Sequence, residues 1–504
     1  MPTAASTPRI AIIGSGYGGA VAALRLAQAG KQVDLIEMGQ DWDKSAPEGA
    51  RFSRMDRPDA RSMWFENRTD MPYTYLSGLD WINRAVPYSA GALGIERFAA
   101  MKVYVGKGLG GGSLVNGGMA VTPRRSFVEK VMPQIDVNEM YTTYLPRANS
   151  ELGVAQPAAD MIGNSPYYQF TRTAAAQNAK AGYQTVTVPN VYDWNYMRME
   201  SFGRVPKSAL ASEVIFGNNY GKKSLTKTYL AKALATGRVN VKALTEVTRI
   251  RRSGAAYVLS TKTISALGAV LNTAETTYDK VILAAGSVGT TRLLLKAQAN
   301  GDLTGLSDKL GKGWGPNGNT MVARLLSGAN STTGTVQSGI PAQGLMAWDD
   351  SEASVFAEIA PFPVGLETRT AGYLALTNNP NTGTFTFNTT TGKMELDWDA
   401  AKHAPSVAAT KAVMERLNAA NGGATRTDML ENGKGYSDYF TYHPLGGCVL
   451  GQATDLNGEL TGAPGVFVMD SSLIPAKLGV NPFVFITALA ERNMDKLLAA
   501  GRLA

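Results

Sequence analysis

A glycine-rich run near the start of the chain is the feature that most restricts its fold. The residues from Arg9 to Ile13 match a short buried strand, and the run from Gly14 to Gly19 follows directly. Small and apolar residues then recur at helical spacing until Gly30. A second strand, from Gln32 to Ile36, ends on the acidic residue Glu37. The order of strand, glycine turn, helix and strand predicts a βαβ unit.

The spacing within this unit is that of a dinucleotide-binding fingerprint. Gly14, Gly16 and Gly19 occupy its three glycine positions, and Glu37 lies 18 residues after Gly19. The glycines permit a tight turn, a close approach of the backbone to a pyrophosphate, and close packing of helix on strand. Free N–H groups at the helix N-terminus can bind phosphate, and Glu37 can bind ribose hydroxyls. The fingerprint predicts an adenine dinucleotide without separating FAD from NAD.

A second glycine cluster indicates close contact with a flat ligand. Five of the seven residues from 106 to 112 are glycine, and apolar stretches lie on both sides. A flexible linker would be polar on both sides, so a backbone that passes close to a ligand explains the cluster better. The 54 glycines among 504 residues also exceed the roughly 7% that is typical.

Further elements of a Rossmann-like domain are dispersed along the chain. Val281 to Ala285 predicts another buried strand with a helix after it, and an antiparallel meander is expected at 247–250, at 256–261 and near Thr277. We therefore predict an α/β fold with a discontinuous Rossmann-like domain and an inserted α+β domain that has a mixed or antiparallel sheet. The cofactor domain is assigned to residues 8–42, 223–313 and 456–504, and the substrate domain to 43–222 and 314–455.

Composition excludes several classes of protein. With 44% hydrophobic and 18% charged residues, the chain is typical of a globular protein. One cysteine and two histidines exclude a disulfide framework and a Cys/His zinc site, and no metal is predicted. The net charge of +8 is scattered, so no nucleic-acid partner is predicted. Because no apolar run is long enough for a bilayer and the start is polar, the protein is either cytoplasmic or has lost an export signal.

Two polar residues near the end of the chain are candidate catalytic residues. His443 and Asn481 each precede a proline, which favours an extended backbone at both positions. Apolar residues after Pro482 recur at helical spacing, so Pro482 is expected at the first helical position and Asn481 at the N-cap. The positive end of that helix would suit an anion. Two glycines closely follow His443, which is predicted to be functional, whereas His403 is expected to be exposed.

Glu358 is the third candidate, a single carboxylate in an apolar stretch from Val355 to Phe362. If this stretch is buried, desolvation raises the pKa of Glu358 and makes it a proton-transfer group. Alternation along a strand leaves an outward-facing position equally open. The one cysteine, Cys448, is most simply a small buried apolar residue.

Four runs of sequence together carry a resemblance to a known family. They are the fingerprint at 14–19, the run from Gly106 to Val121, Tyr442-His443-Pro444-Leu445-Gly446-Gly447-Cys448, and Gly479-Val480-Asn481-Pro482-Phe483. These runs closely resemble the steroid-oxidising members of the glucose-methanol-choline oxidoreductase family, and the resemblance extends over essentially the whole chain. It implies non-covalent FAD, oxidation of cholesterol and related 3β-hydroxysteroids by dioxygen with release of hydrogen peroxide, and isomerisation of the 5-ene to the 4-en-3-one.

Residue by residue, the resemblance implies a set of FAD contacts. The pyrophosphate would lie against Gly14, Gly16, Tyr17, Gly18 and Gly19, and the ribose against Glu37. The flavin would be lined by Gly111, Gly112, Asn116, Gly117 and Met119, with Val247 near the adenine and Phe483 at the flavin end of the last helix. The family often has glycine after the residue matching Asp470, whereas this chain has Ser471, and a backbone contact there requires a negative φ. Residues 365–440 look shorter or altered beside relatives, which leaves the sterol preference open.

The resemblance also implies catalytic roles and partners. His443 and Asn481 would bind the substrate oxygen and orient its C–H bond, and Glu358 would move a proton between two carbons of the ketone. Besides the sterol and dioxygen, a transient membrane contact is expected, with the segment from Met71 to Leu93 as a candidate gate. The resemblance to secreted relatives also implies that this protein is secreted. Two alternatives stay open: an oxidase of a different alcohol with the same fold, and a hydrolase with Ser287 as nucleophile.

Overall fold

The glycine fingerprint folds into the predicted βαβ unit. The computed structural model describes residues 9–71, 75–76, 79–80, 83–327, 336–349, 354–362, 369–437 and 440–503. Strands β1 (Ile10–Ile13) and β2 (Val33–Ile36) pair in parallel, and α1 (Tyr17–Gln28) connects them. Each strand is short and almost wholly buried, which fits the apolar runs of the sequence.

The unit belongs to a five-stranded parallel sheet assembled from distant segments. Its strand order is β22-β12-β1-β2-β8, with β8 (Val239–Lys242), β12 (Lys280–Leu283) and β22 (Val466–Val468) completing the sheet. All five strands lie within the three segments predicted for the cofactor domain. The prediction of a discontinuous Rossmann-like domain is therefore confirmed.

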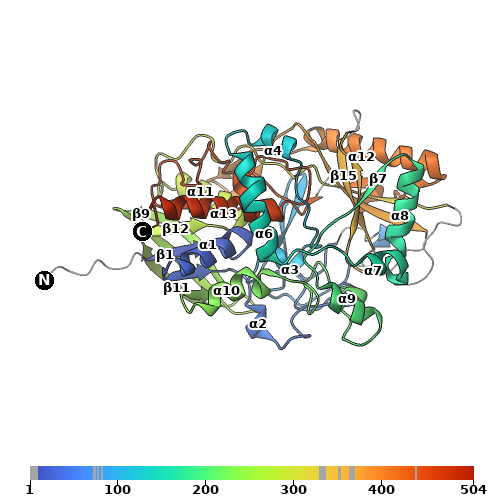
Figure 1. Cartoon of the computed structure of the whole chain (residues 1–504). Helices are drawn as coiled ribbons and strands as arrows, with labels where there is room; N and C mark the ends of the chain where they lie inside the picture. The colour runs from blue at the N-terminus through green and yellow to red at the C-terminus, as the bar shows by residue number, and fades with distance from the viewer. Residues whose placement is uncertain are drawn as a thin grey trace.

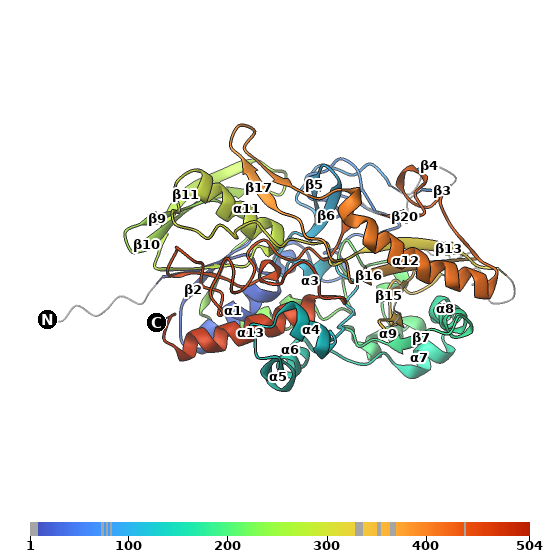
Figure 2. The same ribbon diagram turned by 90° about the horizontal axis from the view of Figure 1, so that it is seen from above.

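Helices and a small antiparallel sheet cover the two faces of this parallel sheet. Figure 1 shows α1, α10 (Tyr229–Ala235) and α13 (Phe483–Ala499) packed together on one side, and Figure 2 shows α1 and α13 side by side there. On the other side lie α11 (Gly286–Ala299) and a meander of β9 (Thr245–Ser253), β10 (Ala256–Ile264) and β11 (Val270–Tyr278). The meander is antiparallel as predicted, with longer strands than expected.

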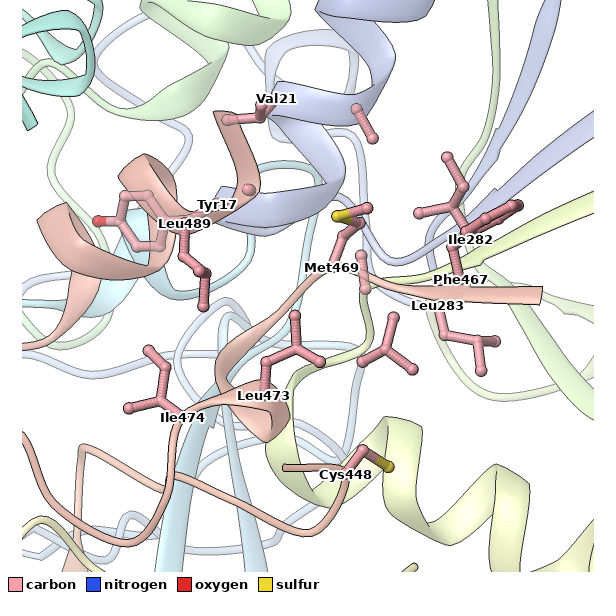
Figure 3. Packing of buried hydrophobic residues seen from close by; sticks show 14 of the residues in the cluster. Tyr17, Val21, Ile282, Leu283, Cys448, Phe467, Met469, Leu473, Ile474 and Leu489 are labelled. Atoms are coloured by element: carbon pink, nitrogen blue, oxygen red, sulfur yellow. The ribbon is translucent and has the colours of Figure 1, made fainter. Parts of the chain in front are cut away.

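Apolar side chains from these elements form the main core. Figure 3 shows Val21 of α1 and Leu489 of α13 close to Met469, with Ile282 and Phe467 projecting from the neighbouring strands. Cys448 lies in the same cluster and is fully buried, which confirms its prediction as a small core residue.

The inserted domain contains a seven-stranded antiparallel sheet. Its members are β7 (Gln184–Thr187), β13 (Thr320–Leu325), β14 (Gln343–Ala347), β15 (Val355–Ala360), β16 (Thr370–Thr377), β19 (Ala424–Thr425) and β20 (Tyr436–Ser437). Helices α8 (Gln169–Lys180) and α12 (Ala400–Asn421) pack against this sheet (Figure 1). All seven strands come from the residues predicted for the inserted domain.

Shorter elements complete the described part of the chain. The helices are α2 (Trp42–Ser45), α3 (Gly112–Val115), α4 (Arg125–Val131), α5 (Val137–Glu139), α6 (Leu145–Leu152), α7 (Ala159–Asn164) and α9 (Trp194–Ser201). The strands are β3 (Tyr75–Leu76), β4 (Leu79–Asp80), β5 (Leu93–Phe98), β6 (Met101–Gly106), β17 (Phe385–Asn388), β18 (Lys393–Leu396) and β21 (Phe440–Thr441). Within the described ranges, none of the helices is both long enough and apolar enough to cross a membrane.

The prediction that His403 is exposed is wrong. His403 lies near the start of α12 and is fully buried, with its Nε2 atom 3.5 Å from Thr320 Oγ1 and its ring against Trp398. The neighbours of His403 in the sequence, Lys402 and Ala404, give no sign of a buried position. Because α12 packs on the sheet, the face of the helix that carries His403 is turned inward.

Candidate active site

One cavity of about 690 Å³ collects almost all of the predicted site residues. The two glycine clusters, the meander and the seven-stranded sheet all contribute to its walls. Its lining includes Gly14, Gly16, Tyr17, Gly18, Glu37, Gly111, Gly112, Asn116, Gly117, Met119, Val247, Glu358, His443, Ser471, Asn481 and Phe483. Segments more than 400 residues apart in the sequence therefore meet at one place.

The two glycine clusters lie against each other at the N-terminus of α1. Gly16 is the N-cap of this helix, and no side chain caps it. A Cβ added to Gly16 would meet nothing within 4 Å, whereas a Cβ added to Gly111 would lie 2.9 Å from Gly16 Cα. The N–H groups at the helix start are thus left accessible beside an open space. This is the arrangement in which a helix N-terminus binds phosphate.

Gly18 and Gly19 are glycines because a side chain at either position would collide with neighbouring backbone. A Cβ on Gly18 would lie 1.5 Å from the carbonyl oxygen of Met469, and one on Gly19 would lie 2.0 Å from that of Gly14. Gly19 does not line the cavity. Its position allows α1 to pack closely on the preceding turn, as the fingerprint requires of its third glycine.

Glu37 connects the fingerprint to the second glycine cluster. Its Oε2 accepts hydrogen bonds from Ser15 N at 3.1 Å and from Ser15 Oγ at 2.6 Å, and its Oε1 accepts from Gly39 N at 2.9 Å. Ser15 Oγ in turn accepts from Gly110 N at 3.0 Å. The carboxylate thus fixes the end of β2 on the cavity wall where the sequence predicts a ribose.

Aromatic and amide side chains define the other end of the cavity. Tyr17 and Phe483 stack with ring centroids 5.0 Å apart, and Asn116 Nδ2 donates to the Tyr17 hydroxyl at 2.6 Å. Burial raises the pKa of Tyr17, so its hydroxyl stays protonated. The Cβ position of Gly117 lies 3.5 Å from Glu358 Oε1, which places the second glycine cluster beside the catalytic candidates.

Glu358 faces the cavity from the middle of the antiparallel sheet. It lies opposite Leu374 of β16, which lies opposite Met321 of β13, and all three side chains line the cavity. Burial raises the pKa of Glu358 to about 7, and a hydrogen bond of 3.1 Å from Asn481 Nδ2 to Glu358 Oε2 partly opposes this rise. Near neutral pH this carboxyl can therefore both accept and donate a proton.

The side chain of Asn481 forms a hydrogen bond across the cavity and does not cap a helix. The N-cap of α13 is Pro482, with no side-chain cap, so the prediction that Asn481 is the N-cap is wrong. Its Nδ2 atom is engaged with Glu358 on a neighbouring strand. Its Oδ1 atom, the one that a helix cap would use to accept from backbone N–H groups, has no hydrogen-bond partner within the described part of the chain.

His443 is held by its backbone and kept neutral by its surroundings. Its N–H donates to Thr441 Oγ1 at 2.9 Å, just after β21. Burial lowers the pKa of the imidazole to about 3, so the ring is uncharged at physiological pH. A neutral imidazole has one donor and one acceptor nitrogen, which suits the binding of a hydroxyl group.

The donor and acceptor pattern of the cavity fits FAD and an alcohol. Among the described residues, His443 Nδ1, Asn481 Oδ1 and Asn116 Oδ1 are buried polar atoms without a hydrogen-bond partner. Buried polar atoms are normally satisfied, so these three are expected to gain partners when ligands bind. The uncapped N-terminus of α1 and the open space at Gly16 supply the phosphate end of the same cavity.

Ser471 and Val247 also lie on the cavity wall, and their contacts with a cofactor stay a prediction. Ser471 is absent from the described non-glycine residues with positive φ, so the condition for its backbone contact is met. Ser471 Oγ also accepts from Ser287 N at 3.1 Å, and Ser287 Oγ donates to the carbonyl of Gly446 at 2.7 Å. The hydroxyl of Ser287 thus has a structural partner.

Two buried charged residues near the cavity were missed by the sequence reasoning. Asp470 accepts hydrogen bonds from Gly286 N at 3.0 Å and from Ser472 N at 2.9 Å, which fixes the turn before α11. Lys222 is buried and donates its Nζ protons to the carbonyls of Leu114 and Asn116, and burial places its pKa well below the usual value. In the sequence, Asp470 is marked only as a lone Asp after an apolar strand, and Lys222 only as one member of a Lys pair.

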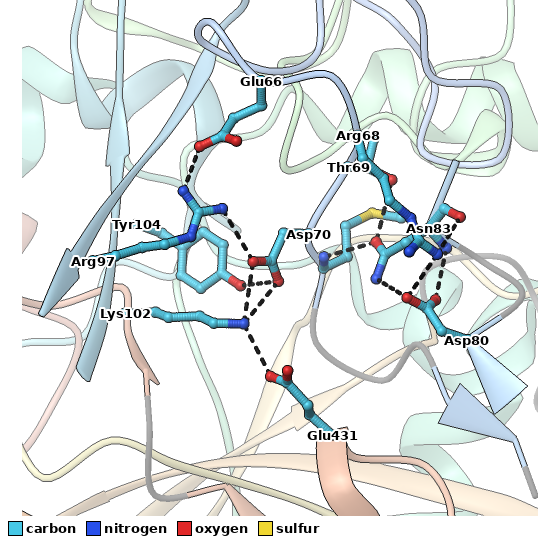
Figure 4. Close-up of polar contacts among 11 residues, drawn as sticks. Glu66, Arg68, Thr69, Asp70, Asp80, Asn83, Arg97, Lys102, Tyr104 and Glu431 are labelled. Atoms are coloured by element: carbon cyan, nitrogen blue, oxygen red, sulfur yellow. Dashed lines mark hydrogen bonds and ion pairs between the residues drawn. The ribbon is translucent and has the colours of Figure 1, made fainter. Parts of the chain in front are cut away.

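The candidate gate from Met71 to Leu93 falls partly outside the described residues, at 72–74, 77–78 and 81–82. Its start is anchored by Asp70, which contacts Arg97, Lys102 and Tyr104 of the β5–β6 hairpin (Figure 4). Lys102 also pairs with Glu431 at 2.9 Å. This network fixes the position of Met71 on the cavity wall, and a gating role of the segment stays a prediction.

The described part of the chain contains no group of three or more His, Cys, Asp or Glu residues that could hold a metal ion. The cavity lining includes the carboxyl of Glu358, the imidazole of His443 and the side-chain amides of Asn116 and Asn481. Such a set can bind a hydroxyl group and move protons, but it supplies no acceptor for a hydride, which a redox cofactor must provide.

Comparison with known proteins identifies the family. Residues 84–304 match the description "GMC oxidoreductase", residues 317–431 match "GMC oxidoreductase, C-terminal", and residues 12–42 match an NAD(P)-binding Rossmann-like domain. The two GMC matches together span about two thirds of the 504 residues.

Curated relatives and solved structures agree with this match. The chain is 25% identical to cholesterol oxidase of Mycobacterium tuberculosis, covering 96% of this chain and 90% of that protein. It is also 25% identical to cholesterol oxidase of Acinetobacter baumannii, covering 97% and 94%. A fungal aryl-alcohol oxidase has the same fold, with a TM-score of 0.66, 12% identity and coverage of 99% and 100%. Pyridoxine 4-oxidase of Mesorbium loti has a TM-score of 0.58, 14% identity and coverage of 98% and 99%. The chain is therefore an FAD-binding alcohol oxidoreductase and belongs to the GMC oxidoreductase family.

Proposed function

We propose that the protein oxidises 3β-hydroxysteroids such as cholesterol, using non-covalently bound FAD and dioxygen, and then isomerises the resulting ketone. The position of Glu358 carries this proposal. Moving a double bond along a steroid skeleton requires a group that takes a proton from one carbon and returns it to another. Glu358 has the burial, the pKa of about 7 and the cavity-facing position that this step needs.

The character of the cavity around Glu358 supports an apolar substrate. Carbon-rich side chains from distant parts of the sequence line the same cavity: Met55, Met71, Val214, Ile215, Met321, Pro341, Phe362 and Leu374. A fused ring system with one hydroxyl group matches a wall that is apolar except for a few convergent polar groups. Two relatives that align along nearly the whole chain are named cholesterol oxidase, which also favours a sterol.

In the oxidation step, the protein holds the hydroxyl and orients its carbon. The neutral ring of His443 offers a donor and an acceptor, and the unpartnered Oδ1 of Asn481 offers a further acceptor. When bound, FAD would supply the acceptor for the hydride of the alcohol, and dioxygen would be the final acceptor of the electrons. The acceptor nitrogen of His443 would take the proton of the substrate hydroxyl. The residues that would hold FAD are the fingerprint glycines, Glu37 and the segment from Gly111 to Met119.

In the isomerisation step, Glu358 acts on the ketone. The carbon between the carbonyl and the double bond, C4, is acidic, and the ionised carboxylate of Glu358 removes its proton. The electron pair of the broken C–H bond moves the double bond into conjugation with the carbonyl. Glu358 then returns the proton to C6, which balances the step without any further reactant. Asn481 Nδ2, 3.1 Å from Glu358 Oε2, keeps the carboxyl in place during both transfers.

Product analysis tests this function. With cholesterol and air, the purified holoprotein is expected to release hydrogen peroxide and the conjugated 4-en-3-one. The Glu358→Gln variant is expected to release the unconjugated 5-en-3-one instead. If cholesterol is not consumed while an aryl or long-chain alcohol is, the enzyme is an oxidase of a different alcohol, the alternative left open by the sequence. The hydrolase alternative is disfavoured by the oxidoreductase family match over most of the chain.

Non-covalent FAD, membrane contact and secretion are part of the proposal and need separate tests. Acid precipitation of the holoprotein should release all of the flavin into the supernatant, and flavin that stays with the pellet would indicate a covalent bond. A sterol partitions into bilayers, so sedimentation with cholesterol-containing vesicles tests the transient membrane contact. Secretion is tested by fractionating the producing cells, and a cytoplasmic location is the alternative outcome.

A further inference from the structure

A short turn outside the cavity contacts both segments that carry the candidate catalytic residues. The turn is Asn317-Gly318-Asn319, and it leads directly into β13. Both asparagines are fully buried, and neither lines the cavity. Their side chains are therefore in a position to act on the site only through other parts of the chain.

Asn317 uses its whole side-chain amide on the three residues before Asn481. Its Oδ1 accepts from Leu478 N at 2.7 Å and from Gly479 N at 3.1 Å, and its Nδ2 donates to the carbonyl of Val480 at 2.8 Å. Its backbone φ of +54° lies in the left-handed region, which asparagine and glycine adopt more readily than other residues. One side chain thus fixes the path of the backbone up to Asn481.

Asn319 acts on the segment before His443 with its amide oxygen alone. Its Oδ1 accepts from Tyr442 N at 3.2 Å, and it shares the one hydroxyl proton of Thr441 with the carbonyl of Pro316, each acceptor lying 3.0 Å from Thr441 Oγ1. The same Thr441 oxygen accepts from His443 N at 2.9 Å. A chain of hydrogen bonds therefore leads from Asn319 through Thr441 to the backbone of His443.

The turn is also connected to Glu358 through the sheet. Met321, two residues after Asn319, lies opposite Leu374, which lies opposite Glu358 on the next strand. The three candidate catalytic residues come from segments that are distant in the sequence, and this turn is adjacent to the supports of all three.

We propose that Asn317 and Asn319 are positioning residues that set the placement of Asn481 and His443 relative to each other. The proposal rests on the proposed roles of His443 and Asn481 in binding the substrate oxygen. Each asparagine holds backbone N–H or C=O groups, so its loss lets the segment shift without removing any group from the cavity. A shift of about 1 Å at a reacting geometry costs on the order of 100-fold in rate.

Substitutions at the two positions test the proposal. Asn317→Gly keeps the left-handed backbone and deletes the amide, and Asn319→Ala deletes the acceptor of Tyr442. Each variant is expected to slow anaerobic reduction of the bound flavin by cholesterol by about 10-fold to 100-fold. The Kd for FAD should change little, because neither residue lines the cavity. Asn317→Asp keeps the left-handed preference and the acceptor oxygens. If Asn317→Gly folds poorly, flavin reduction in Asn317→Asp should be faster than in Asn317→Gly.

Asn379 provides a matched control. It is a buried asparagine whose Nδ2 donates to the carbonyl of Lys402 at 3.0 Å and to Ser406 Oγ at 2.9 Å, and neither of these residues lines the cavity. Asn379→Ala removes a comparable set of hydrogen bonds and should lower Tm without slowing flavin reduction. An equal slowing in Asn379→Ala would show that the effects are those of general destabilisation, and the proposal would be overturned.

Double-mutant cycles separate positioning from other effects. Asn317→Gly should have no further effect in an Asn481→Ala background, yet should keep its full effect in a His443→Ala background. Asn319→Ala should show the reverse pattern. Independent effects in all backgrounds would overturn the proposal.

The histidine resonances give a readout that does not depend on activity. The chain has only two histidines, so the spectrum of His443→Ala identifies the His443 signals in NMR spectra of the holoprotein. Asn319→Ala should shift the imidazole signals of His443, whereas Asn379→Ala should leave them in place, and unchanged His443 signals in Asn319→Ala would contradict the proposal. If His443→Ala and Asn481→Ala do not slow flavin reduction, the proposed function fails, whereas the NMR result still decides the positioning role.

Discussion

The proposed isomerisation should depend on pH because Glu358 is buried. Desolvation raises its pKa from 4.5 to about 7 in the folded protein. A base must be ionised to remove a proton, so isomerisation is expected to be lost as the pH falls through about 7. With that pKa, roughly 90% of Glu358 is ionised at pH 8 and roughly 1% at pH 5. The rate should therefore fall about 100-fold between pH 8 and pH 5.

The assay separates this step from oxidation by supplying the 5-en-3-one directly. Formation of the conjugated ketone is followed by its absorbance, with substrate well below KM, from pH 5 to pH 9. Glu358→Gln serves as the control and should show a low rate at every pH. Asn481→Leu removes the hydrogen bond that lowers the pKa of Glu358, so it should move the bend to higher pH. A rate that is constant between pH 5 and pH 8, or that bends near pH 4.5, would refute the reasoning.

Three further predictions concern stability, oxidation and cofactor binding. The folded pKa of Glu358 lies above its unfolded value, so ionisation of Glu358 lowers the free energy of unfolding by about 3 kcal/mol above pH 7. Glu358→Gln should therefore raise Tm at pH 9 and leave it nearly unchanged at pH 5. His443→Ala should bind FAD normally, but cholesterol should reduce the bound flavin at least about 100-fold more slowly in the absence of oxygen. Stopped-flow absorbance measures this rate, and an unchanged rate would show that the assignment is wrong. A leucine side chain at position 16 would extend into open space, so Gly16→Leu should fold, and calorimetry should find weakened FAD binding. Gly18→Ala meets the carbonyl of Met469 and should lower Tm, and the opposite pattern in this pair would contradict the assigned roles.

Much of the cofactor domain could be predicted because its signals are local. The glycine spacing and Glu37 lie within one βαβ unit, and the structure places them on the wall of one cavity as expected. The resemblance then led to His443 and Asn481, because their motifs are short and contiguous. The structure brings both to the same cavity as the fingerprint.

Other features depend on contacts between distant segments and could not be predicted from local patterns. Alternation along β15 allowed Glu358 on either face, and only the pairing of the strand in its sheet places it in the cavity. His403 lies between Lys402 and Ala404 without a local sign of burial, yet the packing of α12 buries it. Asn481 follows the rules for an N-cap, but a carboxylate 123 residues away binds its amide. The bonds of Asn317 to residues 478–480 span more than 160 positions and leave no local sequence signal.

Anaerobic titration with cholesterol tests the central claim that this cavity brings FAD and a sterol alcohol together at His443 and Asn481. The purified protein should carry flavin absorbance, and adding cholesterol without oxygen should bleach it, with colour returning when air is admitted. The same titration of His443→Ala should leave the flavin bound and largely oxidised over the same time. A protein that binds FAD but is not bleached by cholesterol, or a variant that bleaches as fast as the wild type, would contradict the account.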